Sequence, residues 1–236
     1  MTRTRLFGLL MTIAVTLSMP ARVGADNLLL DPRLDSGTAG GAGLPGTNAF
    51  WTLTNTGNAT AAQYEGGFAN QVNLGGLGVW YRAFLGAAGS GVGSTLTQSV
   101  TATTAGAYVL RFQAVVEQNF LADALNATLT KTGGASVTLD LLSKRVGAGS
   151  TYSGGGFGQI GAATPPYDPR QALSLAGVNA GDTLTVSIEM INGRSSGVNP
   201  QSAVIDNFEL ALIPEPSACV LASSGLLGAL VLRRRR

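Results

Sequence analysis

The sequence contains no histidine, and its single cysteine, Cys219, lies in an apolar run near the carboxyl end. The lack of histidine excludes Ser-His-Asp and Cys-His catalysis and every histidine-ligated zinc or iron site. A lone cysteine excludes an intrachain disulfide and an iron–sulfur cluster, and we interpret Cys219 as an apolar filler residue rather than a nucleophile or lipidation site. The folded part must therefore be stabilised by hydrophobic burial alone.

Charged and aromatic residues are also scarce, at 12% and 6% of the chain. The 15 Lys and Arg residues exceed the 13 Asp and Glu residues, but seven of the arginines lie at the two ends, three within the first 22 residues and four at positions 233–236. Without those seven, eight basic residues stand against 13 acidic ones. The sequence thus gives no support for a nucleic-acid partner, which requires a basic stripe on the folded surface.

The amino-terminal end has the three parts of a secretory signal peptide. Arg3 and Arg5 precede an apolar stretch over residues 6–19, Pro20 ends that stretch, and small residues lead up to Ala25. We predict export by Sec-type machinery and cleavage after Ala25. The alternative, an uncleaved anchor, is disfavoured because the apolar stretch is too short to span a bilayer.

The carboxyl-terminal end combines a short polar motif, an apolar run and a cationic stop. Pro214, Glu215 and Pro216 keep the junction extended. A helix over residues 217–232 would span about 24 Å, short of a hydrocarbon core of about 30 Å, so it is a marginal permanent anchor. An ordinary anchor that is never cut is the alternative. The positive-inside bias holds four arginines on the cytoplasmic side: Arg233, Arg234, Arg235 and Arg236.

This order of motif, helix and arginines resembles the PEP-CTERM sorting signal of Gram-negative bacteria. The resemblance covers residues 214–236 and implies recognition and processing by an exosortase. It further implies transient anchoring in the inner membrane, followed by placement at the cell surface or in an extracellular, exopolysaccharide-rich matrix. It implies a location for the protein and no activity for the body of the chain.

The body, residues 26–213, shows the two-residue alternation of β-strands. In residues 107–116, apolar side chains such as Leu110 and Phe112 alternate with Arg111 and Gln113. Residues 183–190 alternate in the same way, and glycine-rich stretches at 36–47, 85–94 and 147–163 read as surface loops. We predict an all-β, single-domain β-sandwich. Further strands are expected near 28–30, 50–54, 79–84, 95–100, 124–130, 136–142, 172–175 and 203–212.

Both ends of the body resemble those of galactose-binding-like jelly rolls, a group that includes many carbohydrate-binding modules. Residues 27–37, Asn-Leu-Leu-Leu-Asp-Pro-Arg-Leu-Asp-Ser-Gly, are similar to the opening strand and turn, although Leu34 stands where an aromatic residue is usual. Residues 204–210, Val-Ile-Asp-Asn-Phe-Glu-Leu, are similar to the closing strand. The resemblance implies a jelly-roll-like sandwich and a possible glycan ligand.

Asp206 is the acidic residue with the most unusual predicted position. Strict alternation places it on the same face as Val204 and Phe208, where an unpaired carboxylate is costly. Either a bulge turns it outward, or it binds backbone N–H groups, or it binds a hard cation such as calcium. The jelly-roll resemblance implies a structural calcium between the first turn and the last strand, with Asp35 and Asp206 as its candidate ligands; no other cofactor is expected.

Aromatic side chains are the candidate sugar contacts, because the apolar faces of sugars stack on flat rings. In each of the doublets Phe50–Trp51 and Trp80–Tyr81 one ring should point inward and the other outward. The alternative for Trp51 and Trp80 is a place in the core. The candidate ligand-binding residues are Trp51, Trp80, Tyr81, Tyr152, Phe157 and Tyr167.

Taken together, these features predict an exported, non-enzymatic β-sandwich protein of the bacterial cell envelope that binds glycan or exopolysaccharide. One alternative is a structural or adhesive matrix protein that binds no sugar. A carboxylate-based glycan hydrolase is the other, but it needs two converging carboxylates, and no motif in the sequence encloses such a pair.

Overall fold

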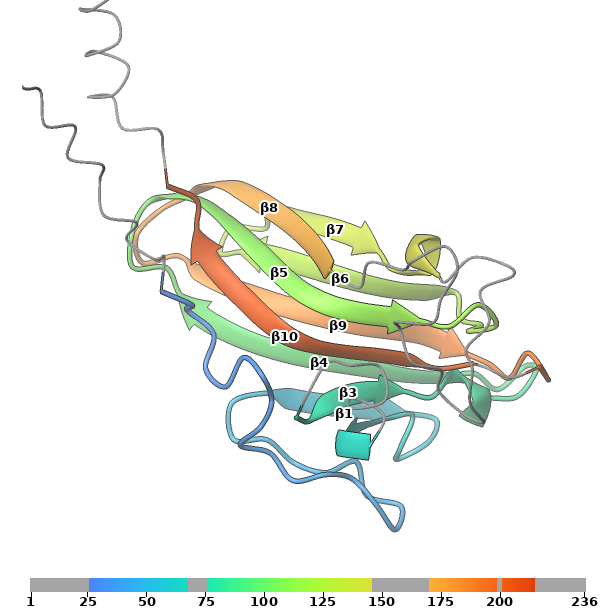
Figure 1. The fold of residues 1–236 in the computed structure, drawn as a ribbon. Helices are drawn as coiled ribbons and strands as arrows, with labels where there is room; N and C mark the ends of the chain where they lie inside the picture. Colours follow the sequence, from blue (N-terminus) through green and yellow to red (C-terminus); the bar gives the residue numbers. More distant parts are fainter. Residues whose placement is uncertain (1–25, 68–75, 146–169, 199–200, 215–236) are drawn as a thin grey trace, which may run out of the picture.

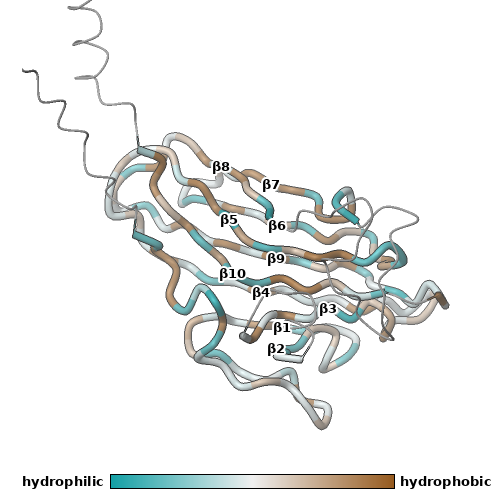
Figure 2. Tube along the Cα trace, in the orientation of Figure 1, coloured by the Kyte–Doolittle hydropathy of each residue, from teal (hydrophilic) through white to brown (hydrophobic). Residues whose placement is uncertain are grey.

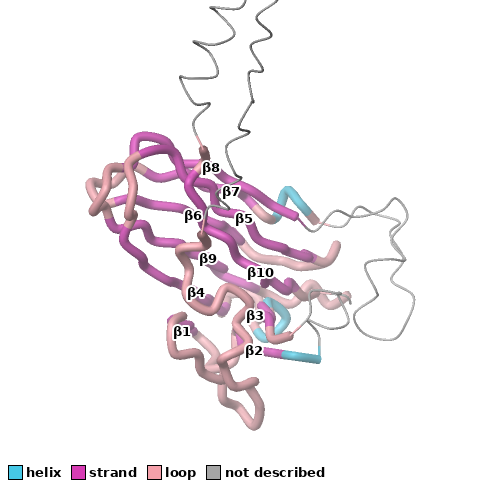
Figure 3. The backbone as a smooth tube through the Cα atoms, turned by 60° about the vertical axis from the view of Figure 1, so that its left-hand side comes forward, coloured by secondary structure: helices cyan, strands magenta, loops and turns pink. Residues whose placement is uncertain are grey.

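The computed structural model describes residues 26–67, 76–145, 170–198 and 201–214. These residues form two antiparallel five-stranded sheets packed face to face, as Figures 1 and 3 show. The prediction of an all-β sandwich is therefore confirmed. Two single turns of 3₁₀ helix, η1 (Ala83–Leu85) and η2 (Leu142–Lys144), also lie in the described ranges.

The first sheet has the strand order β1-β4-β9-β6-β7. Its strands are β1 (Thr52–Thr56), β4 (Val92–Thr101), β9 (Thr183–Gly193), β6 (Ala124–Lys131) and β7 (Ser136–Asp140). The second sheet has the order β2-β3-β10-β5-β8. Its strands are β2 (Ala62–Glu65), β3 (Gly78–Tyr81), β10 (Ala203–Leu212), β5 (Gly106–Val116) and β8 (Arg170–Val178).

The core lies between the sheets and is built by the alternation visible in the sequence. In β9, Leu184, Val186, Ile188 and Met190 are buried, and Leu110 and Phe112 of β5 face them from the second sheet. Figure 2 shows the same pattern, with apolar and polar residues interspersed along the strands. The predicted division of residues 107–116 and 183–190 into an inner and an outer face is correct.

The outer face of the first sheet consists largely of hydroxyl side chains. The strand registers place one row of five hydroxyl residues across all five strands: Thr52, Thr97, Ser187, Thr128 and Thr138. Neighbouring hydroxyls bond to each other, Ser99 to Thr185 at 2.8 Å and Thr128 to Thr138 at 3.1 Å. We call this surface the hydroxyl face.

Two predicted strands differ from the structure. Residues 28–30 form no strand, because the chain pairs with the end of β10 only through isolated bonds, such as the one from Leu28 N to Leu210 O, before it turns with positive φ at Asp31 and Leu34. The strand expected over 79–84 ends at Tyr81 and continues into η1. Gly86 then passes so close to Gly193 O that a Cβ would lie 2.0 Å from it, which explains a glycine at this position.

Candidate functional site

A bulge in β10 determines which side chains reach the outer face of the second sheet. The pairing of β10 with β5 shifts between Asp206 and Glu209, and Asn207 has φ +55°. Before the bulge Asp206 pairs with Gln113, so the two side chains share the outer face. After the bulge Phe208 returns to the core, where its ring stacks on Phe112. Strict alternation, which would place Asp206 on the same face as Phe208, fails here, and the first of the three alternatives is confirmed, because the extra residue of the bulge turns Asp206 away from the core.

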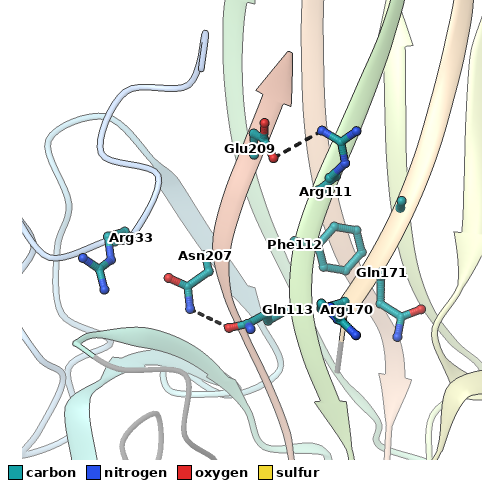
Figure 4. A pocket seen from close by; sticks show the side chains of 9 residues that line it. Arg33, Arg111, Phe112, Gln113, Arg170, Gln171, Asn207 and Glu209 are labelled. Carbon is teal, nitrogen blue, oxygen red and sulfur yellow. Dashed lines mark hydrogen bonds and ion pairs between the residues drawn. The ribbon is translucent and has the colours of Figure 1, made fainter. Parts of the chain in front are cut away.

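Next to the bulge lies an open groove of about 680 Å³ on the outer face of the second sheet. Figure 4 shows that its residues come from four neighbouring segments: the amino-terminal segment, β10, β5 and β8. We call it the β10–β5–β8 groove. It is lined by Arg33, Arg111, Phe112, Gln113, Arg170, Gln171, Ala172, Asn207 and Glu209.

Two contacts hold the groove side chains in place. The Asn207 amide donates a hydrogen bond to Gln113 Oε1 at 2.7 Å, which links β10 to β5. Arg111 Nη1 lies 3.3 Å from Glu209 Oε2, and these side chains are 52% and 42% exposed. The groove therefore presents planar guanidinium, amide and carboxylate groups, which are the polar groups that fix the orientation of a hydroxyl-rich or charged ligand.

The groove residues were not predicted as a site. Arg111 and Gln113 were assigned to the polar face of their strand, and Arg33 to the opening turn, but nothing in the sequence places these segments side by side. The register of β5 with β8 and β10 supplies that information: Arg170 pairs with Gln113, and Glu209 pairs with Arg111.

Two of the candidate sugar-binding aromatics lie in the core. Trp51 is 3% exposed, donates its indole N–H to the carbonyl oxygens of Leu30 and Asp31, and packs 4.7 Å from the Phe208 ring. Tyr81 is fully buried and donates its hydroxyl to Ile188 O. Neither ring offers a face to a ligand, so their proposed role in stacking is wrong; burial in a two-sheet core is the physical reason.

The remaining aromatic candidates do not lie in the core of the described residues. Trp80 lies half-buried on the outer face of the second sheet, with the Arg82 guanidinium 4.6 Å from its ring centre. Phe50 is 45% exposed while Trp51 is buried, so each doublet has one inward and one outward ring, as predicted. Tyr152, Phe157 and Tyr167 lie outside the described residues.

Asp206 has the environment of a cation ligand. Its side chain is 0% exposed, and neither carboxylate oxygen accepts a hydrogen bond of normal geometry from the described residues. Burial raises the pKa of Asp206 to about 8; the neighbouring Asn207 N–H opposes this effect, and the charge of Asp35 adds to it. A buried carboxylate that accepts no hydrogen bond of normal geometry could ligate a hard cation such as calcium, which prefers oxygen ligands.

Asp35 is the second predicted ligand, and its charge acts on Asp206. Its Oδ1 accepts a hydrogen bond from Leu77 N at 3.1 Å. Within the described ranges, no group of three or more Asp, Glu, His or Cys side chains is placed to hold a metal ion. A cation held by Asp206 and Asp35 would therefore also need backbone carbonyl or water ligands, which calcium accepts.

Glu117 is the other buried acid with a strongly raised pKa. It is 2% exposed, and Ser202 N donates a hydrogen bond of 2.5 Å to its Oε2. Burial raises the pKa of Glu117 to about 7, although the bonds from Ser202 oppose the effect. Glu117 lies four residues beyond Gln113, the partner of Asp206, so the two acids are about 13 Å apart along the sheet.

The predicted targeting segments fall almost wholly outside the described residues. Residues 1–25, with the predicted cleavage position Ala25, and residues 215–236, with Glu215, Pro216 and the four terminal arginines, are not described, and Pro214 is the last described residue. In the part of the chain that the structure covers, no helix has the length and apolar character needed to cross a membrane.

Comparison with known proteins finds likeness only among solved structures. No known protein-family profile matches the chain, and no curated protein matches it. One similar structure is a family 61 carbohydrate-binding module solved with β-1,4-galactotriose, at 15% identity over 80% of this chain and 100% of that one, with a TM-score of 0.44. A family 35 module from Clostridium thermocellum has 17% identity over 68% and 90% of the two chains, with a TM-score of 0.37.

An adhesin domain is similar to the same extent. The K1 cleaved adhesin domain of Lys-gingipain from Porphyromonas gingivalis has 10% identity over 77% of this chain and 96% of that domain, with a TM-score of 0.43. These similarities are ones of overall strand arrangement. The function of this chain therefore has to be argued from its own residues.

Proposed function

We propose that this chain is an exported cell-surface or matrix protein whose β-sandwich body binds a glycan, without catalysis, in the β10–β5–β8 groove. One observation supports the proposal most directly: guanidinium, amide and carboxylate side chains from adjacent strands line a single open groove. Such side chains bond sugar hydroxyls in pairs, and a rigid sheet holds them in fixed positions. The open groove suits a chain-like ligand.

The arrangement of carboxylates supports binding rather than hydrolysis. Glycoside hydrolases use two carboxyl groups about 5 to 10 Å apart on either side of the scissile bond. Among the lining residues Glu209 is the single carboxylate, and it is paired with Arg111. The acids with strongly raised pKa values, Asp206 and Glu117, are buried and about 13 Å apart by register.

A second candidate function is that of a structural or adhesive matrix protein that binds no sugar. The hydroxyl face is the observation that favours it, because a broad surface of Thr and Ser side chains can form many hydrogen bonds with a neighbouring protein. The two proposals use opposite faces of the sandwich and can be separated by substitution.

Replacing Gln113 with Ala should weaken glycan binding about tenfold, because the variant loses a polar groove contact and the hydrogen bond from the Asn207 amide to Gln113. Binding would be measured by affinity electrophoresis of the purified protein in gels that contain bacterial exopolysaccharide. Asn126→Ala, a half-buried amide residue of β6 in the opposite sheet, is the matched control and should bind like the wild type. Absence of binding by the wild type would favour the matrix role, whereas equal binding by wild type and Gln113→Ala would place the glycan outside the groove.

The proposed sorting route predicts a defined exported form. Its intact mass should lack residues 1–25, and the tail should be cut near Pro214, Glu215 and Pro216 if an exosortase processes it. Deleting the genes for exosortase-type proteases should leave the tail uncut. A secreted form that retains all of residues 214–236 in the wild-type host would contradict this part of the proposal.

A further inference from the structure

The basic residues of the body are concentrated in the β10–β5–β8 groove. Outside the seven arginines at the two ends, the chain has eight basic residues against 13 acidic ones. Three of those eight, Arg33, Arg111 and Arg170, line this one groove, together with a single carboxylate. The groove is therefore locally cationic on a body that is acidic as a whole, and it would attract an anionic ligand.

The strand registers place Arg111 and Arg170 near each other on adjacent strands. Arg111 pairs with Ala172, and Arg170 pairs with Gln113, so the two arginines are diagonal neighbours on adjacent strands, with Cα atoms about 7 to 8 Å apart. Ala172, opposite Arg111, is a small exposed residue that leaves room above the sheet. Arg33 approaches from the far side of β10, so the three arginines span about 14 Å across four neighbouring segments (Figure 4).

The internal ion pairs of the groove are of the weak kind. Arg111 and Glu209 are both about half exposed, and Arg33 lies 3.9 Å from Asp35 with both side chains exposed. Exposed pairs of this type contribute little to stability. An incoming carboxylate can therefore replace Glu209 or Asp35 at a guanidinium at little cost, and the flat fork of arginine binds a carboxylate through two parallel hydrogen bonds.

We propose that the ligand of this groove is an acidic polysaccharide, whose uronate carboxylates bind Arg111 and Arg170 while its hydroxyls bind the groove amides. This inference rests on the proposed glycan-binding function and specifies its substrate class. A carboxylate can form two parallel hydrogen bonds with each guanidinium, whereas a neutral glycan would offer the two arginines only hydroxyl groups.

The test compares one polymer with and without its carboxylates. Binding of the exported protein to polygalacturonate and to the same polymer after carboxyl reduction would be measured by titration calorimetry, without added divalent cations. We expect the reduced polymer to bind at least tenfold more weakly, and binding of the acidic polymer to weaken further as NaCl is raised from about 0.05 to 0.5 M. Poly-L-glutamate should bind weakly, because it lacks sugar hydroxyls.

Each outcome separates the two proposals. Equal binding of both polymers would overturn the acidic-glycan inference and leave glycan binding in place, whereas binding of neither would overturn both. Binding of polyglutamate as strong as that of polygalacturonate would show attraction by charge alone and would also overturn the inference.

Substitutions locate the site within the molecule. Arg111→Gln and Arg170→Gln should each weaken polygalacturonate binding about tenfold, and Lys144→Gln, an exposed basic residue in η2 outside the groove, should not. Arg111→Lys keeps the charge but loses the paired hydrogen bonds, so it should bind with intermediate strength. Thermal unfolding checks the fold of each variant, and the comparison of the two polymers on the wild-type protein stands even if a variant fails to fold.

Discussion

Calcium should raise the unfolding temperature of the chelator-treated protein by about 10 °C, and Asp206→Asn should abolish that increase. A ligand at about a thousand times its Kd stabilises a folded protein by about 4 kcal/mol, and each kcal/mol is about 2 to 4 °C for a domain of this size. The cation is placed here because Asp206 is fully buried and neither of its carboxylate oxygens accepts a hydrogen bond of normal geometry from the described residues. Differential scanning calorimetry with EDTA and then with excess CaCl₂ would measure the shift.

In the absence of calcium, the Asp206→Asn substitution should itself stabilise the protein. In EDTA, Asp206→Asn should unfold at a higher temperature than the wild type, because it removes a buried ionisable group that has no partner. Glu189→Gln, which changes an exposed acid of β9 on the other sheet, is the matched control and should keep the full calcium response. Identical melting of the wild-type protein in EDTA and in calcium would exclude a structural cation at this site.

Raising the pH from about 5 to 8 should destabilise the wild-type protein by about 3 kcal/mol through Glu117 alone. Its pKa is about 7 in the folded protein against a usual value of 4.5, and each pKa unit corresponds to about 1.4 kcal/mol. Below the usual value, Glu117 is protonated in both states and its contribution to stability is fully present. Between the two pKa values Glu117 is ionised only in the unfolded chain, so unfolding releases a proton and stability falls as the pH rises. Above about pH 7 Glu117 is ionised in the folded protein as well, and its contribution to stability has been lost.

Glu117→Gln should remove this part of the pH dependence. The glutamine oxygen can still accept the hydrogen bond from Ser202 N, so the variant should match the wild type near pH 5 and exceed it in stability near pH 8. Urea unfolding of both proteins at several pH values, all in EDTA, gives a difference in which the contribution of Asp206 cancels. Glu189→Gln serves as the exposed-acid control. A difference between Glu117→Gln and wild type that does not change with pH would contradict the assignment.

The parts of the fold that depend on local alternation could be predicted from the sequence. The inner and outer faces of residues 107–116 and 183–190, and the inward and outward rings of the two aromatic doublets, follow from the two-residue period of a strand.

The candidate site itself depends on information that alternation does not contain. The bulge at Asp206 and Asn207 adds one residue to β10 relative to β5, so it is a property of two strands and cannot be read from one. The groove likewise exists because Arg170 pairs with Gln113 from a strand more than 50 residues away along the chain. Trp51 was a candidate for the surface because the alternation of a doublet shows that one ring points into the core but does not show which of the two rings it is.

The two ends of the described body run antiparallel beside each other. Leu28 N bonds to Leu210 O, the side chain of Asn27 bonds to Leu210 N and Phe208 O, and Phe208 N bonds to Pro32 O. A mechanical load that pulls residue 27 away from residue 213 would therefore break these bonds one after another, starting at Asn27 and ending at Pro32. Arg33 follows directly after Pro32, so the last step of such peeling would withdraw one of the three groove arginines while the other sheet stayed intact. If the protein is held at its carboxyl end, tension would then weaken ligand binding before the two sheets unfold.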